Sequence, residues 1–122
     1  MRVLLSIKPE FASKIFDGSK RYEYRRVIFK RDEVTTIVVY ASVPIKKVIG
    51  EFEIAEILHD EPKLLWATTG EQSGITKKRF LQYFANILMG YAIKIKQARK
   101  YEIPVPINQF TLSRPPQSFM YL

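Results

Sequence analysis

Residues 3–25 read VLLSIKPEFASKIFDGSKRYEYR, and the hydrophobic period changes twice within this stretch. The apolar run at residues 3–7 is typical of a strand, and Pro9 presets the backbone for the first turn of a helix. Apolar residues then recur at helical spacing until the stop signal Asp-Gly, so we predict a helix over residues 9–17. Residues 21–25 alternate between faces as in a strand. The stretch therefore predicts a strand–helix–strand unit.

The chain beyond this unit continues as strands with two further helices between them. The β-branched run at residues 36–41 predicts a strand, as do the alternating runs at 48–58 and 91–96. The spacing of apolar residues predicts helices over residues 62–69 and 76–87.

The end of the chain is less regular. Prolines recur across residues 103–117, and they favour loops and edge conformations before a final apolar run at residues 119–122. We find no internal repeat and no linker, so we expect one domain over residues 1–122. About six short strands with two or three helices predict a small α+β barrel.

Composition excludes several kinds of chemistry. The 122 residues contain no cysteine and one histidine, His59, which excludes thiol nucleophiles, disulfides and thiolate metal sites and argues against a His-rich metal centre. We therefore expect no metal and no other cofactor. No apolar run approaches the roughly 20 residues of a membrane span, and the apolar stretch near the N-terminus is too short for a secretory signal. We expect a cytoplasmic protein without a membrane partner.

Charge is distributed unevenly along the chain, whose net charge is +8. Residues 1–50 carry 11 − 5 = +6, residues 51–75 carry 1 − 6 = −5, and residues 76–122 carry 8 − 1 = +7. This pattern fits either phosphate contacts or a solvated charged face on a soluble protein. The densest basic run, with Glu23 as its one acid, consists of Lys20, Arg21, Arg25, Arg26, Lys30 and Arg31.

Positive charge also begins the helix predicted at residues 76–87. Lys77, Lys78 and Arg79 follow the expected cap Thr76, and cations in a first turn oppose the helix dipole. Either an anion binds nearby or the unfavourable charge is tolerated.

The strand–helix–strand unit carries a candidate binding site. Lys8 and Lys20 lie at its two ends, and the return of the chain brings both ammonium groups near one mouth, while Glu23 and Arg25 share one face of the second strand. Lys20 and Arg25 could hold a phosphate or a base carbonyl, with Glu23 orienting Lys20 or accepting a hydrogen bond from an exocyclic amine. Alternatively, Glu23 neutralises both cations in a structural ion-pair network.

Two further groups of residues are candidates for nucleic-acid binding. Tyr40 could stack on a base while Ser42 reads its edge, or Tyr40 could be a core tyrosine. Arg114, Gln117 and Ser118 donate hydrogen bonds from a segment stiffened by two prolines, which suits a loop that reaches into a cleft. The same segment could instead only anchor the chain end.

The signature Gly18-x-Lys20-x-x-Glu23-x-Arg25, preceded by Ser6-Ile7-Lys8-Pro9-Glu10-Phe11, resembles the ASCH domain family. Among the members of this family, the chain is similar to those described as predicted transcriptional regulators. The likeness lies in three segments: Tyr40-Ala41-Ser42-x-Pro44, Gly50-Glu51-Phe52 and Arg114-Pro115-Pro116-Gln117-Ser118-Phe119. The resemblance implies a PUA-like β-barrel, related to modules that bind RNA or modified bases, with a cleft where the signature residues gather.

The resemblance also raises the possibility of catalysis. Some ASCH proteins resemble amidohydrolases of N-acetylated cytidine that use a lysine, a threonine three residues later and a distant glutamate. Lys20 matches the lysine, whereas position 23 is Glu, and Glu51, Glu53 and Glu71 are equal candidates for the distant acid. If the protein is an enzyme, we expect Lys20 and Glu23 to form its acid/base pair.

Two functions that involve nucleic acid follow, beside a third possibility, a protein-interaction domain with a basic face that does not bind nucleic acid. The first is a module that binds RNA or a nucleotide in a basic cleft, with DNA as a possible partner, in translation or transcription control. The second is a hydrolase of a modified nucleoside or of RNA. The sequence leaves the ligand and the oligomeric state open.

Overall fold

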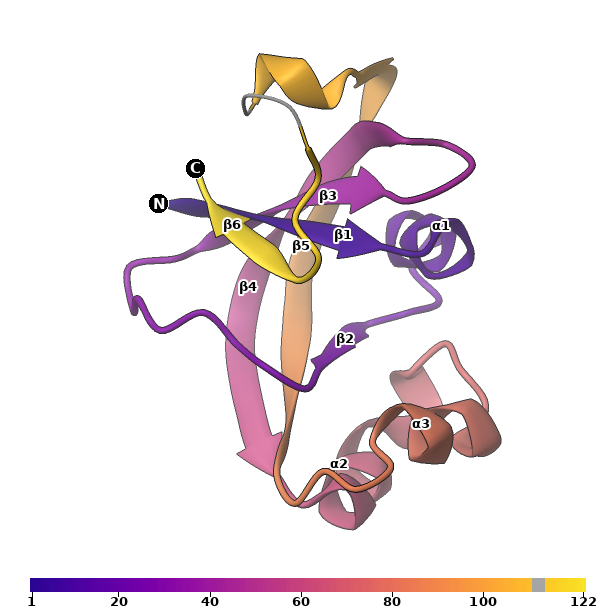
Figure 1. The fold of residues 1–122 in the computed structure, drawn as a ribbon. Helices are drawn as coiled ribbons and strands as arrows, with labels where there is room; N and C mark the ends of the chain where they lie inside the picture. Colours follow the sequence, from indigo (N-terminus) through magenta and orange to yellow (C-terminus); the bar gives the residue numbers. More distant parts are fainter. Residues whose placement is uncertain (111–113) are drawn as a thin grey trace.

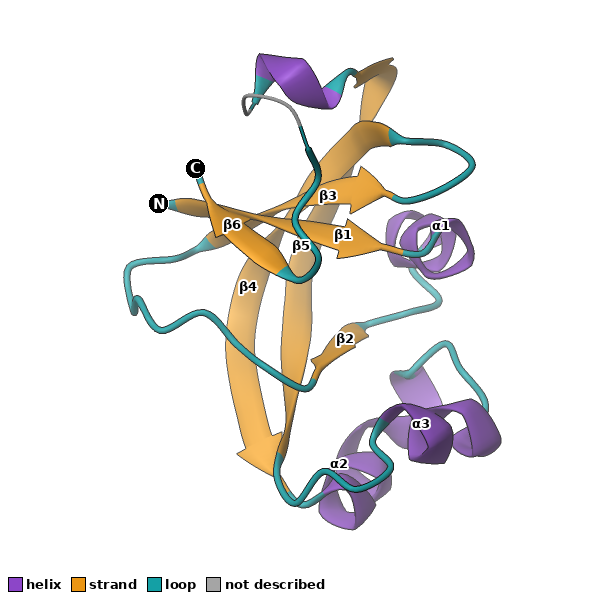
Figure 2. Ribbon diagram, in the orientation of Figure 1, coloured by secondary structure: helices purple, strands orange, loops and turns teal. Residues whose placement is uncertain are grey.

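The computed structural model describes residues 1–110 and 114–122, which form a single mixed sheet with the α-helices along one side and a short 3₁₀ helix at residues 107–109 apart from them (Figures 1 and 2). The elements, in chain order, are β1 (Arg2–Ile7), α1 (Pro9–Asp17), β2 (Tyr22–Arg25), β3 (Thr36–Ala41), β4 (Lys47–Asp60), α2 (Pro62–Thr69), η1 (Gly70–Gln72), α3 (Lys77–Tyr83), β5 (Gly90–Val105), η2 (Ile107–Gln109) and β6 (Phe119–Tyr121).

The sheet has the strand order β2-β5-β4-β3-β1-β6, so β2 and β6 are its two edges. β1 and β3 pair in parallel, with α1 in the connection between them, and the other described pairs are antiparallel. The sheet curls strongly, and the long strands β4 and β5 cross behind β1 and β6 (Figure 1). The α+β fold with six strands and three α-helices confirms the predicted class, and the curled sheet is an open half-barrel.

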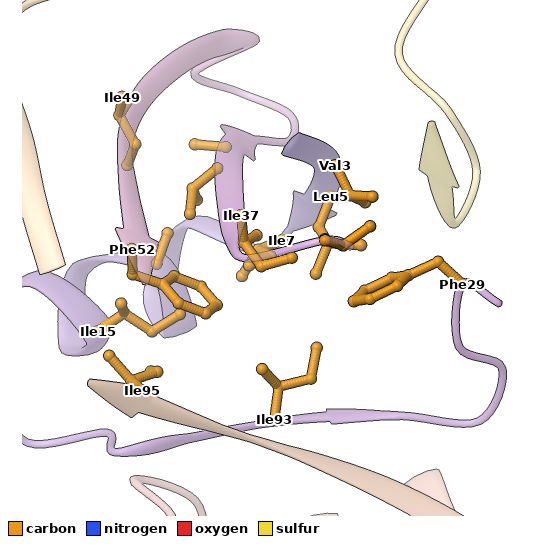
Figure 3. Close-up of a cluster of buried hydrophobic side chains, with 14 residues drawn as sticks. Val3, Leu5, Ile7, Ile15, Phe29, Ile37, Ile49, Phe52, Ile93 and Ile95 are labelled. Atoms are coloured by element: carbon orange, nitrogen blue, oxygen red, sulfur yellow. The ribbon is translucent and has the colours of Figure 1, made fainter. Parts of the chain in front are cut away.

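The inside of the curl holds the largest hydrophobic cluster. Alternate residues of four strands point inward and meet Ile15 of α1 and Phe29 of the β2–β3 connection, as Figure 3 shows. Phe52 of β4 is 1% exposed near the centre of the cluster. Since α1 contributes to this core, its position against the end of β1 is fixed.

A second cluster attaches the helical segment 62–83 to the sheet. Leu65 of α2 and Phe80 and Phe84 of the α3 region pack against Tyr24 of β2. The rings of Tyr24 and Phe80 meet edge to face at 4.9 Å between centroids. This packing brings α3 beside β2, although the two elements are separated by about half of the chain.

Two predicted boundaries are wrong. β5 extends to Val105 instead of ending at Lys96. The strand tolerates Pro104, which has no backbone N–H, because the pairing with β4 is interrupted between Lys100 and Val105 and requires no hydrogen bond from that position. α3 ends at Tyr83 instead of residue 87, since the chain turns there and Asn86 adopts a positive φ of 64°.

In the described part of the chain, no helix combines the length and hydropathy needed to cross a bilayer.

Candidate functional site

A cavity of about 620 Å³ lies between the end of β1, α1, β2, α3 and the segment before β6. Its charged lining is mostly cationic: five cations and one carboxylate give 5 − 1 = +4. The charged residues that line it are Lys8, Lys20, Glu23, Arg25, Arg26 and Arg79.

The strand–helix–strand unit builds one side of this cavity. Lys8 follows β1 and precedes α1, which ends at Gly18 with φ 89°, a left-handed conformation that suits glycine. The turn is closed by a hydrogen bond from the Lys20 N–H to the Lys14 carbonyl at 3.0 Å. Lys8 and Lys20 both line this cavity, Lys8 as an exposed side chain and Lys20 as a buried one, so the two lysines converge on one cavity but do not both lie at its mouth.

Lys20 forms the floor of the cavity and is only 2% exposed. Its Nζ donates to the Ser73 carbonyl at 2.9 Å and lies over the rings of Tyr24 and Phe11 at 4.8 and 5.3 Å from their centroids. Burial lowers the pKa of Lys20 from its usual value, while the Glu23 carboxylate opposes that shift. Burial also raises the pKa of the Tyr24 phenol, to about 12.

Glu23 and Arg25 form an ion pair in the wall of the cavity. Arg25 Nη1 lies 3.3 Å from Glu23 Oε2, and the two side chains are 11% (Arg25) and 7% (Glu23) exposed. Both groups are thus largely removed from water, so each depends on the other to compensate its buried charge.

Arg25 also attaches the C-terminal segment to the site. Nη2 donates to the carbonyl and hydroxyl oxygens of Ser118 at 3.1 and 3.3 Å, and Nη1 donates to the Ser6 carbonyl at 3.4 Å as well as to Glu23. These four bonds engage all four Nη hydrogens. Ser6 Oγ adds a bond to the Pro116 carbonyl at 2.7 Å. The guanidinium of Arg25 is therefore a positioning group that holds the cavity wall together.

Two other arginines stack on aromatic rings at the rim. The Arg26 guanidinium lies 4.4 Å from the Tyr83 ring centroid, and its Nε donates to the Tyr83 carbonyl at 2.7 Å. Arg79 lies 4.7 Å from the Phe11 ring centroid and forms an ion pair with Glu10 at 3.0 Å. Both contacts orient a cation without burying it completely.

The structure brings most of the predicted site residues into this one cavity, where Gln117 and Ser118 join the charged residues named above. Tyr40, Ser42 and Arg114 lie elsewhere. Tyr40 is 5% exposed in a cluster with Leu4 on the other face of the sheet, which favours the core alternative over a base platform. Ser42 begins the β3–β4 turn, and Arg114 is exposed, outside the cavity lining.

The three glutamates proposed as a distant acid do not line the cavity either. Glu51 accepts hydrogen bonds from Arg99 and Tyr101 on β5, while Glu53 and Glu71 are exposed. Among residues 1–110 and 114–122, no three acidic or histidine side chains group as metal ligands would.

The sequence predictions missed the contribution of α3 to the cavity. Arg79, Gln82 and Tyr83 line it from this helix, together with Phe11 from α1 and Ile75 from the preceding loop. One signal was present: the basic first turn after the cap Thr76, whose Oγ1 accepts from the Arg79 N–H at 3.2 Å. Of the three cations in that turn, Arg79 lines the cavity, where an anion could be bound.

Comparison with known proteins gives a family match over most of the chain. The model of the ASCH domain matches residues 5–105. A protein of Zymomonas mobilis named ASCH domain-containing ribonuclease is 28% identical over 123 residues, covering 98% of this chain and 82% of the relative.

Two further comparisons extend this result. A large ribosomal subunit protein uL22 of Ureaplasma parvum is 28% identical over 124 residues, but this chain, 98% of which is covered, spans only 39% of that relative. The crystal structure of ASCH from Zymomonas mobilis superposes with a TM-score of 0.90 and 27% identity, over 99% of this chain and 87% of that one.

Proposed function

Because this chain belongs to the ASCH domain family, we propose that it binds RNA and holds one nucleotide of a single strand in the cationic cavity. The observation that carries the proposal is the net charge of +4 in the lining of one concave site, given by side chains of β2 and α3 and of the segments between β1 and α1, between α1 and β2, and after β2. The name of the Zymomonas mobilis relative, a ribonuclease, supports RNA as the ligand class. We further propose a role in translation or transcription control, for which the ribosomal relative favours translation.

The size of the cavity supports a nucleotide as the bound unit. Its volume of about 620 Å³ falls within the range of roughly 300–1,000 Å³ that small-molecule sites occupy. Apolar side chains from Phe11, Val27 and Ile75 share the lining with the cations. A base needs apolar contacts and a phosphate needs cations, and this lining offers both.

The exposed cations at the rim suit the phosphates of the strand. Lys8 is exposed beside the mouth, and Arg79 is oriented by Phe11. Each phosphate that they neutralise releases condensed counterions. The logarithm of the binding constant for RNA should therefore fall linearly with the logarithm of the salt concentration.

Charge reversal at the rim tests this proposal without disturbing the buried network. We expect Lys8→Glu to weaken binding of a fluorescein-labelled hexauridylate by about tenfold and to reduce the salt slope by about one. The matched control is Lys96→Glu, which reverses an exposed cation of β5 outside the cavity lining. Binding that is indifferent to salt, or equal effects of the two variants, would contradict the proposal. A single-stranded DNA of the same sequence tests whether the 2′-hydroxyl matters.

RNA hydrolysis is a second candidate, favoured by the ribonuclease name of the Zymomonas mobilis relative. In such a reaction Glu23 would take the proton of a 2′-hydroxyl, O2′ would attack phosphorus, and the P–O5′ bond would break as Lys20 donated a proton to O5′. The lowered pKa of Lys20 supports a proton donor of this kind.

Product analysis separates hydrolysis from binding. The protein is incubated with single-stranded RNA and with N-acetylated cytidine, and cleavage or deacetylation is followed by chromatography. Products that disappear with Lys20→Met would support an enzyme, provided that the variant keeps its thermal transition. Absence of product from both substrates would leave RNA binding alone.

A further inference from the structure

The hydrogen-bonding groups of the cavity are mostly engaged by the protein itself. All four Nη hydrogens of Arg25 are donated to protein oxygens, and Lys20 donates to the Ser73 carbonyl beneath two aromatic rings. A guest that enters the cavity must therefore find other partners. Within the described residues, Glu23 and Tyr83 are two groups of the lining that keep capacity to bind a guest, besides the two remaining hydrogens of the Lys20 ammonium.

The first group is the free oxygen of Glu23. Its Oε2 is paired with Arg25, whereas no hydrogen bond reaches Oε1 from any described residue. In the described part of the chain, no fully buried side-chain oxygen or nitrogen lacks a partner, so Oε1 must be accessible. Because Glu23 lines the cavity and is 6% exposed in total, that access is from the cavity. Glu23 thus offers the guest one acceptor.

The second group is the hydroxyl of Tyr83. Its oxygen accepts a hydrogen bond from the Arg26 N–H at 3.2 Å, while its own hydrogen meets no acceptor among the described residues. The Arg26 side chain stacks on the ring and binds the Tyr83 carbonyl, which fixes the phenol against the cavity. Burial raises the pKa of Tyr83, so the hydroxyl keeps its proton at neutral pH. Tyr83 thus offers the guest one donor.

An acceptor and a donor in one cavity match a particular chemical edge. On its Watson–Crick edge, each base carries an N–H next to an acceptor: N3–H beside O4 in uracil, for example, or N4–H beside N3 in cytosine. A phosphate at the same place would meet the Glu23 carboxylate, and like charges repel strongly in a poorly solvated site. The buried part of the cavity therefore suits a base, and the exposed rim suits the phosphates.

We propose that Glu23 and Tyr83 bind the Watson–Crick edge of one unpaired base, with Glu23 accepting from its N–H and Tyr83 donating to the neighbouring acceptor. This inference rests on the proposed RNA binding and adds its selectivity. Pairing occupies the N–H that Glu23 needs, and methylation of that nitrogen in uracil removes it, so the protein should discriminate against duplexes and against bases that lack this N–H.

Two methylated hexamers test the inference. Fluorescence anisotropy compares labelled hexauridylate with a hexamer of N3-methyluridine, which lacks the N–H, and with a hexamer of 5-methyluridine, which carries the same methyl group on the opposite edge. We expect the N3-methyl hexamer to bind about tenfold more weakly, since the Glu23 oxygen is left unpaired, and the 5-methyl hexamer to bind like the unmodified one.

Protein variants assign the discrimination to the two residues. Tyr83→Phe and Glu23→Gln should each move the affinity ratio between the uridine and N3-methyluridine hexamers toward one. Tyr91→Phe is the matched control: Tyr91 is half-buried, stacks on His59 outside the cavity, and should leave the ratio unchanged. If Glu23→Gln fails to fold because Arg25 loses its partner, Tyr83→Phe decides the question alone.

The outcomes separate the inference from the proposed function. Equal binding of all three hexamers with a normal salt dependence would overturn base-edge recognition and leave RNA binding in place. A discrimination that survives both Tyr83→Phe and Glu23→Gln would overturn the assignment to these residues. Absence of binding to every hexamer at low salt would overturn both the inference and the proposed function.

Discussion

Two basic regions of this molecule differ in how their charges are compensated. Along the antiparallel pair of β4 and β5, cations of β5 face glutamates of β4 in register, as Arg99 faces Glu51 and Lys94 faces Glu56. The lining of the cavity holds five cations and one carboxylate, and a second carboxylate, Glu10, pairs with Arg79 at the rim. Charge cancels along the β4–β5 pair and accumulates in the cavity lining, although both regions are rich in Lys and Arg.

This difference explains why a count by segment is a poor guide to a binding surface. The acidic segment 51–75 and the basic segment 76–122 look like separate blocks in the sequence, but antiparallel pairing of β4 with β5 puts parts of them side by side. Burial differs as well: Arg99 is 69% exposed in its ion pair, and Arg25 is 11% exposed in its own. Loss of one partner should therefore cost far more stability in the cavity pair.

The largest expected effect comes from removing one partner of each pair. Arg25→Ala leaves Glu23 buried without a counter-charge and frees the Ser118 segment, so we expect the free energy of unfolding to fall by about 3–5 kcal/mol. Arg99→Ala removes a solvated partner and should cost less than about 1 kcal/mol. Urea denaturation of both variants measures the contrast.

A double variant checks that the unpaired charge is the cause. Arg25→Ala combined with Glu23→Leu removes both charges, and it should be more stable than Arg25→Ala alone. Similar losses for Arg25→Ala and Arg99→Ala would mean that burial does not distinguish the two pairs.

A second contrast concerns two tyrosines whose pKa values are both raised to about 12. Burial is the largest cause of the raised pKa of each tyrosine, and Glu51 raises the pKa of Tyr101 further. The two residues differ in exposure: Tyr24 is 5% exposed beside the cavity, and Tyr101 is half-buried. The hydroxyl of each tyrosine ionises near pH 10 in the unfolded chain and only at higher pH in the folded chain. The free energy of unfolding therefore falls as pH rises from about 10 to about 12. Two pKa units correspond to about 2–3 kcal/mol for Tyr24.

Alkaline unfolding of two variants measures this loss. Tyr24→Phe should lose less stability than the wild type between about pH 10 and about pH 12, and Tyr101→Phe should differ less from the wild type because water screens a half-exposed group. The other titrating groups are shared by all three proteins, so they cancel in the comparison. Identical pH profiles for Tyr24→Phe and the wild type would refute the expectation.

The elements near the cavity were predictable where their signals are local. Pro9 and Gly18 bound α1 in the sequence as they do in the structure, and the predicted helix over residues 62–69 has the bounds of α2. The presence of Lys8 and Lys20 in one cavity was also predictable, because only α1 and a short turn separate them in the sequence. Local signals from proline and glycine therefore sufficed to place this side of the site.

The rest of the site depends on contacts that no local pattern contains. Ser118 bonds to Arg25 across 93 residues, and Tyr83 reaches Arg26 across 57. Tyr40 was a plausible base platform in the sequence because a strand end can be exposed, but the outer face of the sheet is covered there by apolar residues of the segment 101–110. Tertiary packing, which periodicity does not encode, decided which aromatic ring faces the cavity.

The smallest contrast compares two glycines with positive φ on either side of Lys20. Gly18 has φ 89°, and a Cβ added there would meet no neighbouring atom within 4 Å, so Gly18→Ala carries only backbone strain, about 1 kcal/mol. Gly74 has φ 69°, and a Cβ there would lie 2.7 Å from Lys20 Cβ, an atom that cannot move without the backbone. Gly74→Ala should therefore cost about 1–2 kcal/mol more than Gly18→Ala, because it also pushes the loop away from the buried lysine. Urea denaturation gives the difference, and equal losses would show that the loop carrying the Ser73 carbonyl adjusts freely around Lys20.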